Sequence, residues 1–259
     1  MRKRRSEDSY KEVRERRTKA LILDKNSKGN LKLDALYNIL LKRFGFQHWW
    51  PGETKFEIFV GAILTQQTSW KNVEKSISAL KEEKLLTIES ISKIKLDKLE
   101  QLIKPSGYYK QKAKRLKSIS TAIISKYSSL KELFKNDVEA LRNILLSFNG
   151  IGRETADSII LYAAEKPIFV IDAYTKRIMN RLYNINEDID YDVLRKYFED
   201  NLEKNVELYK DMHAQFVALG KMYCKKKDPI CTDCPLNNYC SYKRNRKNEN
   251  NINNIDIKR

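Results

Sequence analysis

The fold of this chain is decided by the run Leu146-Ser147-Phe148-Asn149-Gly150-Ile151-Gly152-Arg153-Glu154-Thr155-Ala156. A short amphipathic pattern precedes the glycine turn, and a second helical pattern begins at Glu154. Gly150 and Gly152 permit positive φ and a close approach of another backbone, while Ile151 between them can anchor the turn in the core. The run therefore predicts two short helices joined by a tight turn.

Such a hairpin can dock on DNA. Backbone amides at the turn and at the start of the second helix would face outward, where they can bind a phosphate without reading a base. An ordinary helical hairpin is the alternative, and Gly-Ile-Gly alone does not decide between the two. The longer pattern Gly-Ile-Gly-Arg-x-Thr-Ala favours DNA docking. The residues expected to contact DNA here are Gly150, Ile151, Gly152, Arg153 and Thr155.

The rest of the chain also reads as helix. Apolar residues recur at helical spacing, as in Phe56, Phe59, Val60 and Ile63. The eight glycines and five prolines fall mostly at joints between such segments. The β-branched stretch 168–171 could be a strand, but it is isolated, so we expect a buried connector. The predicted fold class is all-α.

Composition points to a polyanionic partner. The chain has 259 residues and a net charge of +17, which fits nucleic acid first; a lysine-rich solvated surface is the alternative. No run of eighteen apolar residues occurs and the first twenty residues are charged, so we expect no membrane segment and no secretory signal. Residues 1–30 are expected to form a basic arm and 244–259 a disordered tail.

All four cysteines lie within seventeen residues, with the spacing C-x6-C-x2-C-x5-C. Four thiolates around one point select zinc or an iron–sulfur cluster, and their clustering favours a reducing compartment over a disulfide framework. The expected ligands are Cys224, Cys231, Cys234 and Cys240.

The hairpin, an aspartate about twenty residues after it and the cysteine loop together resemble the endonuclease III superfamily of helix–hairpin–helix DNA glycosylases, over roughly residues 31–243. The resemblance implies two subdomains. A six-helix region, 54–167, would end in the hairpin, and 31–53 with 168–243 would carry a C-terminal [4Fe–4S] loop. Double-stranded DNA with a damaged base would lie across the cleft between them.

In this family the aspartate is catalytic, and Asp172 matches it. A carboxylate near C1′ can stabilise the oxocarbenium character that develops when the N-glycosidic bond breaks; a helix N-cap is the alternative role. Bifunctional members carry a lysine where this chain has Glu154. A carboxylate cannot form an imine, so the resemblance implies a monofunctional enzyme without AP lyase activity, unless another lysine substitutes.

Further motifs resemble the 3-methyladenine DNA glycosylase III branch, among them Gln47-His48-Trp49-Trp50-Pro51 and Gly61-Ala62-Ile63-Leu64-Thr65-Gln66-Gln67-Thr68. The branch implies a pocket in which aromatic rings select alkylated purines such as 3-methyladenine; core packing is the alternative for at least one tryptophan. The best-known members of the branch lack the cluster cysteines that this chain keeps. The pocket residues are expected to be Trp49, Trp50, Pro51, Trp70 and Glu154.

Gln67 matches the position from which relatives fill the gap left by a flipped base, and Lys112 belongs to a stretch expected to face phosphates. His48 and His213 receive no catalytic role. We expect a monomer in the cytoplasm of a prokaryote, associated with the nucleoid. Glycosylases for hypoxanthine, uracil or oxidised pyrimidines, a glycosylase/lyase, and a non-catalytic DNA-binding protein remain as alternatives.

Overall fold

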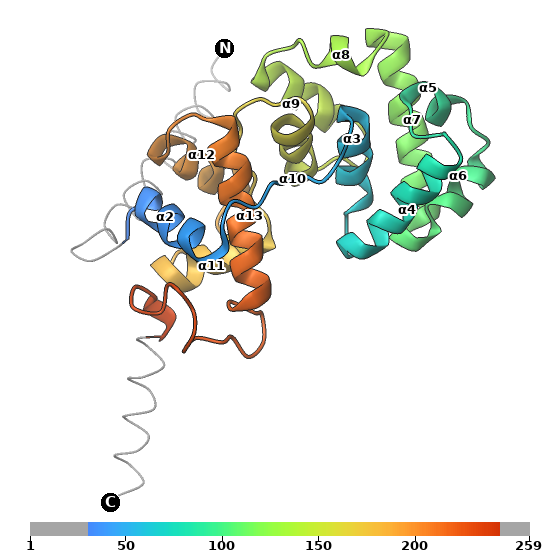
Figure 1. Cartoon of the computed structure of the whole chain (residues 1–259). Helices are drawn as coiled ribbons and strands as arrows, with labels where there is room; N and C mark the ends of the chain where they lie inside the picture. The colour runs from blue at the N-terminus through green and yellow to red at the C-terminus, as the bar shows by residue number, and fades with distance from the viewer. Residues whose placement is uncertain (1–30, 244–259) are drawn as a thin grey trace, which may run out of the picture. The chain divides into compact units, whose positions relative to one another are not determined.

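The computed structural model of the chain describes residues 31–243 (Figure 1). Every regular element within this range is a helix, so the all-α prediction is confirmed. The predicted basic arm and disordered tail lie outside the described residues. The elements are α2 (Leu33–Phe44), α3 (Lys55–Leu64), α4 (Trp70–Glu82), α5 (Ile88–Lys93), α6 (Leu96–Leu102), η1 (Lys104–Ser106), α7 (Tyr109–Tyr127), α8 (Leu130–Leu133), α9 (Val138–Ser147), α10 (Arg153–Ser158), η2 (Ile159–Ala163), α11 (Ala173–Tyr183), α12 (Tyr191–Asn201) and α13 (Val206–Met222).

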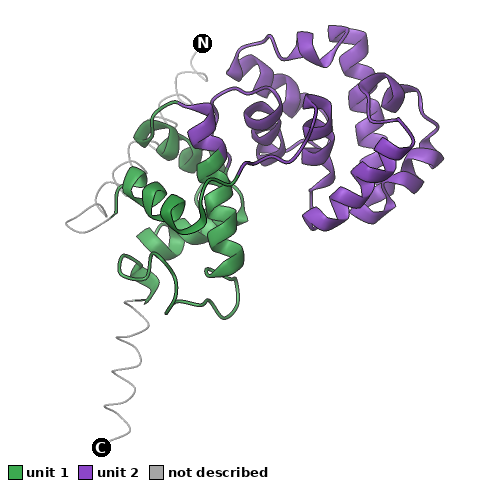
Figure 2. Ribbon diagram, viewed as in Figure 1, with its two compact units in different colours: residues 1–47, 171–204, 211–259 green, residues 48–170, 205–210 purple. Residues whose placement is uncertain are grey.

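The chain forms two compact units (Figure 2). Unit 1 contains the described residues 31–47, 171–204 and 211–243, and unit 2 contains 48–170 and 205–210. These limits differ from the expected subdomains at two places, since 48–53 and 205–210 both belong to unit 2. The tryptophan pair and the hairpin are therefore parts of the same unit.

Unit 2 contains more helices than the six that we expected. The additional ones are short: α5, α6 and α8 have 6, 7 and 4 residues. Two of them begin at a side-chain cap, because the hydroxyls of Thr87 and Ser129 accept hydrogen bonds from amides three residues later. A helix of one or two turns has too few positions for an apolar period to reveal it.

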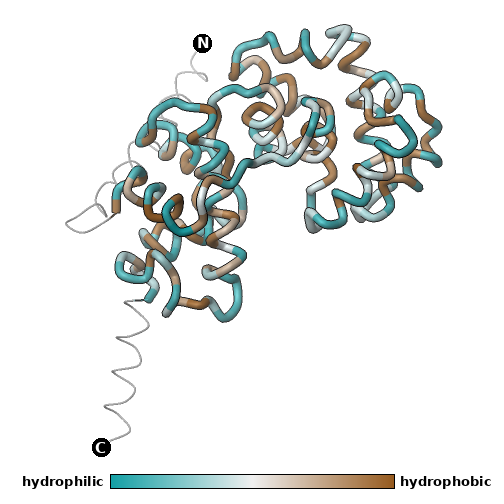
Figure 3. Tube along the Cα trace, viewed as in Figure 1, coloured by the Kyte–Doolittle hydropathy of each residue, from teal (hydrophilic) through white to brown (hydrophobic). Residues whose placement is uncertain are grey.

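The core of unit 2 is built around α3, in which all residues from Phe59 to Leu64 are buried. All five residues of η2 are buried, and η2 packs against α3. Figure 3 shows that hydrophobic and hydrophilic residues alternate along most helices, as one-sided burial requires. None of the helices in residues 31–243 is long and apolar enough to cross a membrane.

Unit 1 has its own core. Leu36 and Leu40 of α2 are fully buried, and the rings of Phe198 and Phe216 meet edge to face with centroids 5.7 Å apart. The buried carboxylate of Asp211 accepts hydrogen bonds from the Tyr37 hydroxyl and the Gln47 amide, at 3.0 and 2.7 Å. These bonds fasten α2 and the segment after it to α13.

The stretch 168–171 has no regular secondary structure and is fully buried, so it is the buried connector that we expected. It runs directly into Asp172, the N-cap of α11. The burial of four consecutive β-branched or aromatic residues fixes the backbone from which Asp172 projects.

Candidate active site

The hairpin forms as the sequence predicts. Helix α9 ends at Ser147, the turn follows, and α10 begins at Arg153, one residue before the expected start. Ile151 is 6% exposed and anchors the turn, and its amide donates to the Phe148 carbonyl at 3.1 Å. This amide is used inside the turn, so a phosphate would meet the amides that follow it.

The two glycines of the turn have different roles, contrary to our expectation. Gly150 has φ +85°, and a Cβ there would overlap the Arg115 side chain. Gly152 has φ −90° and ψ 177°, which any residue adopts, and a Cβ there would meet nothing within 4 Å. Only Gly150 needs positive φ and close approach. Gly152 instead leaves open space beside the N-terminus of α10.

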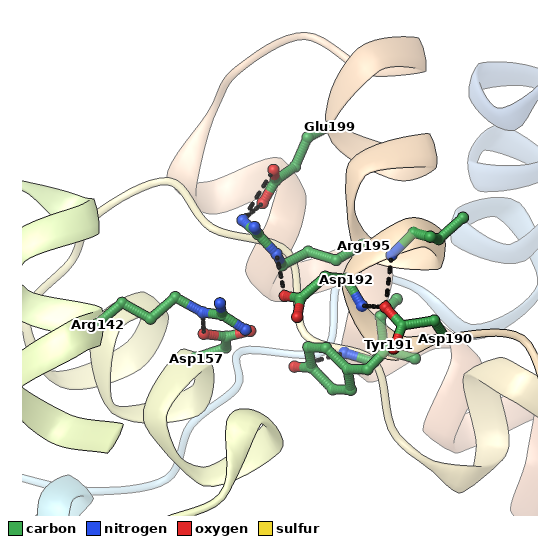
Figure 4. Close-up of polar contacts among 9 residues, drawn as sticks. Arg142, Asp157, Asp190, Tyr191, Asp192, Arg195 and Glu199 are labelled. Carbon is green, nitrogen blue, oxygen red and sulfur yellow. Dashed lines mark hydrogen bonds and ion pairs between the residues drawn. The ribbon is translucent and has the colours of Figure 1, made fainter. Parts of the chain in front are cut away.

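Two sets of buried contacts hold the hairpin. The guanidinium of Arg142 on α9 forms a two-pronged pair with the Asp157 carboxylate on α10, with nitrogen–oxygen distances of 2.6 and 3.2 Å (Figure 4). The side-chain amide of Gln66 donates to the Gly150 carbonyl and to the Thr155 hydroxyl, both at 3.0 Å. The Thr155 side chain is therefore turned inward, so a contact of this residue with DNA would have to come from its backbone.

Gly152, Arg153 and Glu154 are exposed on the second half of the hairpin. They form the N-cap and the first turn of α10, where helical amides lack intrahelical acceptors and the helix dipole favours an anion. Glu154, expected in the base pocket, lies on this exposed turn.

Asp172 caps α11, so the alternative role raised from the sequence is present. One carboxylate oxygen, Oδ1, accepts hydrogen bonds from the Thr175 amide at 2.7 Å and the Thr175 hydroxyl at 2.8 Å. The other, Oδ2, lies 3.6 Å from Nε2 of His213. Capping thus occupies one oxygen and fixes the direction of the other.

The electrostatics keep Asp172 charged. Burial by itself would raise the pKa of this carboxyl, but the contact with His213 and the two hydrogen bonds from Thr175 outweigh it. The resulting pKa lies below the ordinary value of 3.8. Near neutral pH, Asp172 is a largely buried carboxylate whose side chain is 11% exposed.

His213 on α13 is a residue to which the sequence gave no role. Its side chain is 6% exposed and faces Asp172 from a helix that begins more than thirty residues later in the chain. A lone histidine among apolar residues carries no local signal, because only the fold brings it to the carboxylate.

Aromatic rings gather in unit 2 as the sequence predicts for the pocket tryptophans. The Trp50 ring lies between the other members, with its centroid 5.7 Å from Trp49, 5.4 Å from Trp70 and 5.3 Å from Tyr162. The three tryptophans are half-buried and Pro51 is exposed. Gly61 makes room for this aromatic cluster, because a Cβ there would lie 3.2 Å from the Trp50 indole nitrogen.

Tyr162 was not among the expected pocket residues. It lies on η2, just after the hairpin, and its hydroxyl donates to the Lys210 carbonyl at 3.2 Å. In the sequence it reads as one more apolar position of the second hairpin helix.

The segment between α3 and α4 presents Gln67. This residue is exposed and has φ 54°, a left-handed conformation that is uncommon outside glycine. Its neighbour Gln66 is bonded to the hairpin, as described above. The structure thus separates two adjacent glutamines, one used internally and one directed to solvent.

The expectation that Lys112 faces phosphates is wrong. Its side chain is buried, and Nζ donates to the carbonyls of Leu64 and Ser106 at 2.9 and 2.7 Å. The lysine reads as surface in the sequence because its carbonyl partners lie outside α7. Lys110 and Lys114 on the same helix are exposed.

The four cysteines converge in unit 1. All of them line one small cavity of about 30 Å³ that is partly open to solvent, together with Arg181, Tyr223 and Tyr242. Burial first, and then the other three thiols, raise the pKa of the Cys234 thiol to about 11. Within residues 31–243, no three His, Cys, Asp or Glu side chains are placed to hold one metal ion. The thiols thus line the same cavity, but they are not arranged around one point.

Basic groups surround this cavity. The guanidinium of Arg181 lies 3.4 Å from the Cys224 sulfur and donates to the carbonyls of Lys225 and Lys226 at 2.7 and 3.0 Å. Arg177 donates to the Cys224 carbonyl at 2.8 Å. Soft thiols in a set of four, beside a guanidinium that can offset thiolate charge, fit an iron–sulfur cluster or zinc.

Comparisons with known proteins agree with this arrangement. A provisionally named DNA repair glycosylase of Methanocaldococcus jannaschii, MJ1434, is 50% identical over 79% of this chain and 94% of its own length. Endonuclease III of Thermotoga maritima is 31% identical over 83% and 94%, respectively. The crystal structure of H. pylori 3-methyladenine DNA glycosylase bound to 1,N6-ethenoadenine has 33% identity and a TM-score of 0.64, over 73% of this chain and 95% of that one.

The model of the HhH-GPD superfamily of base excision DNA repair proteins matches residues 60–204. This range contains the hairpin, the aromatic residues Trp70 and Tyr162, and Asp172. The chain therefore belongs to the HhH-GPD superfamily, the endonuclease III superfamily of DNA glycosylases that its motifs predicted.

Proposed function

We propose that this DNA glycosylase is monofunctional and hydrolyses the N-glycosidic bond of alkylated purines in double-stranded DNA, 3-methyladenine first. The observation that carries the substrate class is the aromatic cluster of Trp49, Trp50, Trp70 and Tyr162. Electron-rich ring faces attract cationic or electron-poor bases more strongly than normal ones. The relative from H. pylori, which is named for 3-methyladenine and binds an ethenoadenine, supports this choice.

Asp172 is the proposed catalytic residue. Cleavage of the glycosidic bond places positive charge on the sugar, which a fixed carboxylate stabilises. The same group can orient or deprotonate the attacking water. Because Thr175 holds Oδ1, the orientation of Oδ2 is fixed before substrate binds.

Two observations support the absence of lyase chemistry. Glu154 stands on the first turn of α10, where a carboxylate cannot form a Schiff base. Burial, and to a smaller extent the charge of Arg115, lower the pKa of Lys112 to about 8. A lysine with such a pKa would suit the role of a nucleophile. However, its Nζ is enclosed and bonded to two carbonyls, so a sugar could not reach it.

We further propose that the four cysteines hold a [4Fe–4S] cluster. Cys224, Cys231, Cys234 and Cys240 would be its ligands. When bound, the cluster would cross-link the loop through four thiolates and so stabilise it. A single zinc ion would draw four sulfurs to about 2.3 Å from one point; the similarity of the chain to endonuclease III supports the cluster instead.

The test is base release from methylated duplex DNA, with and without a later alkali step. We expect free 3-methyladenine and strands that break only after alkali. Strand breaks without alkali, or a covalent adduct trapped by borohydride, would instead indicate a glycosylase/lyase. If no methylated base is released, a panel of duplexes with hypoxanthine, uracil and oxidised pyrimidines would show whether another base is the substrate.

A matched pair of variants tests the role of Asp172. Asp190 also caps a helix in unit 1, accepting from the Asp192 amide at 3.0 Å (Figure 4). Asn retains capping ability at both positions. We expect Asp172→Asn to abolish base release and Asp190→Asn to preserve it. Equal activity in the two variants would move the catalytic role away from Asp172.

A further inference from the structure

Lys112 is an unusual residue for the interior of this protein. It is 2% exposed, although it carries an ammonium group and a long side chain. The contacts of Nζ within the described residues are two main-chain carbonyls, of Leu64 and Ser106. A buried charge that is satisfied by carbonyls costs solvation energy. A lysine buried at this cost in solvation free energy is expected to have a compensating role in the structure.

The two carbonyls lie where segments end. Leu64 is the last residue of α3, and Ser106 is the last residue of the 3-10 helix η1. The final carbonyls of a helix have no intrahelical donor and carry partial negative charge. Lys112 therefore acts as a C-terminal cap on α3, supplied from α7. The cap lies at the point where the segment 65–69 begins.

A second group holds the same segment from the other side. Gln66 is tied to the hairpin through the Gly150 carbonyl and the Thr155 hydroxyl. Arg115, one helical turn after Lys112 on α7, packs against Gly150 and has Nη1 3.5 Å from Oε1 of Gln66. The loop is thus fixed to α7 at its start and to the hairpin at its second residue.

Between these attachments and α4 the segment presents Gln67, exposed and in a left-handed conformation. We propose that Lys112 is a positioning residue: by capping α3 it fixes segment 65–69, so that Gln67 is held ready to fill the space of a flipped base. This inference rests on the proposed glycosylase function and on the gap-filling role that the family resemblance implies for Gln67. Lys112 itself would touch neither DNA nor substrate.

Lys112→Met removes the charge with little change of volume, and Lys126→Met is the matched control. Lys126 is an exposed lysine in the last turn of the same helix. Three quantities are compared in the full-length protein: amide exchange over 61–68, affinity for undamaged duplex, and the single-turnover rate of base release. For Lys112→Met we expect amide exchange over 61–68 to become roughly tenfold faster and base release roughly tenfold slower, because two buried carbonyls lose their hydrogen-bond donor. The affinity for undamaged duplex should stay within about twofold of the wild-type value.

A double-mutant cycle separates positioning from general stability. If Lys112 acts through Gln67, then Lys112→Met should slow base release far less in a Gln67→Ala background than in the wild type. Equal slowing in both backgrounds, or unchanged exchange over 61–68, would overturn the proposal. So would a borohydride-trapped adduct that disappears in Lys112→Met, since it would make Lys112 a nucleophile.

Two provisions keep the outcomes distinct. If Lys112→Met does not fold, Gln66→Ala removes the second attachment at a half-buried position, and an unchanged rate of base release would count against the proposal. If the wild-type protein releases no base from any lesion, the proposed function fails. The exchange measurement would then still show whether Lys112 fixes the segment.

Discussion

The two hairpin glycines allow a sharp test of how this protein meets DNA. Gly150→Ala places a Cβ at φ +85° and against Arg115. A left-handed alanine costs about 1–2 kcal/mol, and displacing the Arg115 side chain adds to it. For a protein of this size each kcal/mol lowers Tm by about 2–4 °C. We therefore expect Gly150→Ala to fold, with a Tm lower by roughly 4–8 °C.

Gly152→Ala should leave stability almost unchanged. Its φ and ψ suit alanine and nothing lies within 4 Å of the added Cβ. Alanine at this position reduces the entropy of the unfolded chain, which stabilises by about 0.4–1 kcal/mol. Alanine is also a poorer N-cap than glycine, by about 0.5–1 kcal/mol. The two effects offset each other, so the expected change in Tm is near zero.

For DNA affinity, in contrast to stability, we expect Gly152→Ala to be the more damaging of the two variants. If a phosphate approaches the amides after Gly152, the new Cβ occupies the space that it needs, and affinity for any duplex should fall roughly 5- to 10-fold, or about 1–1.4 kcal/mol. The salt dependence of binding should not change, because no charged group is lost. Thermal unfolding and fluorescence anisotropy at two salt concentrations measure these quantities. Wild-type affinity in Gly152→Ala would refute docking through this turn.

Three further predictions concern the other parts of the candidate site. Asp172→Ala should lower the free energy of unfolding by about 1–2 kcal/mol through the lost cap, while Asp172→Asn should lower it much less. Because the folded-state pKa of Asp172 is lowered, its charge stabilises the fold above the ordinary pKa, and that stability is lost as pH falls through the folded value. Asp172→Asn should therefore flatten the acid limb of a plot of Tm against pH. Trp50→Ala should reduce base release more than DNA affinity, because phosphate contacts dominate affinity; equal losses would indicate a packing role. The purified protein should be yellow-brown with about four irons per chain, and metal analysis that finds stoichiometric zinc without iron would contradict the proposed cluster.

Much of the candidate site could be predicted because its signals are local. The glycine turn, the anchoring Ile151 and the N-cap at Asp172 each depend on residues within a few positions of one another. The buried connector 168–171 follows from four adjacent residues of one character. Backbone sterics and short-range hydrogen bonds decide such features, and one stretch of sequence contains all the partners.

The residues that sequence analysis misplaced depend on distant partners. Lys112 finds one of its carbonyls 48 residues earlier in the chain. Its spacing from Leu116 and Ile119 places it on the buried face of α7, but that spacing does not show which acceptors its ammonium group meets there. His213 meets Asp172 only after α13 packs in unit 1, and Tyr162 joins Trp50 only after η2 and the tryptophan segment pack in unit 2. Helical periodicity indicates which face of a helix is buried, but it does not indicate which distant residue contacts a side chain on that face.

The cap at Asp172 and the catalytic role that we propose for this residue support each other. A catalytic carboxylate must be charged and correctly oriented before substrate arrives, and ordering a side chain costs entropy. The cap meets this cost in the folded protein, because Thr175 holds Oδ1 through two hydrogen bonds. The same bonds lower the pKa of the group against the effect of burial. Since Oδ2 takes no part in the cap, it remains for chemistry, with His213 beside it. An N-cap is therefore a suitable place for the carboxylate that we propose as catalytic, because the capping hydrogen bonds would orient it before substrate binds.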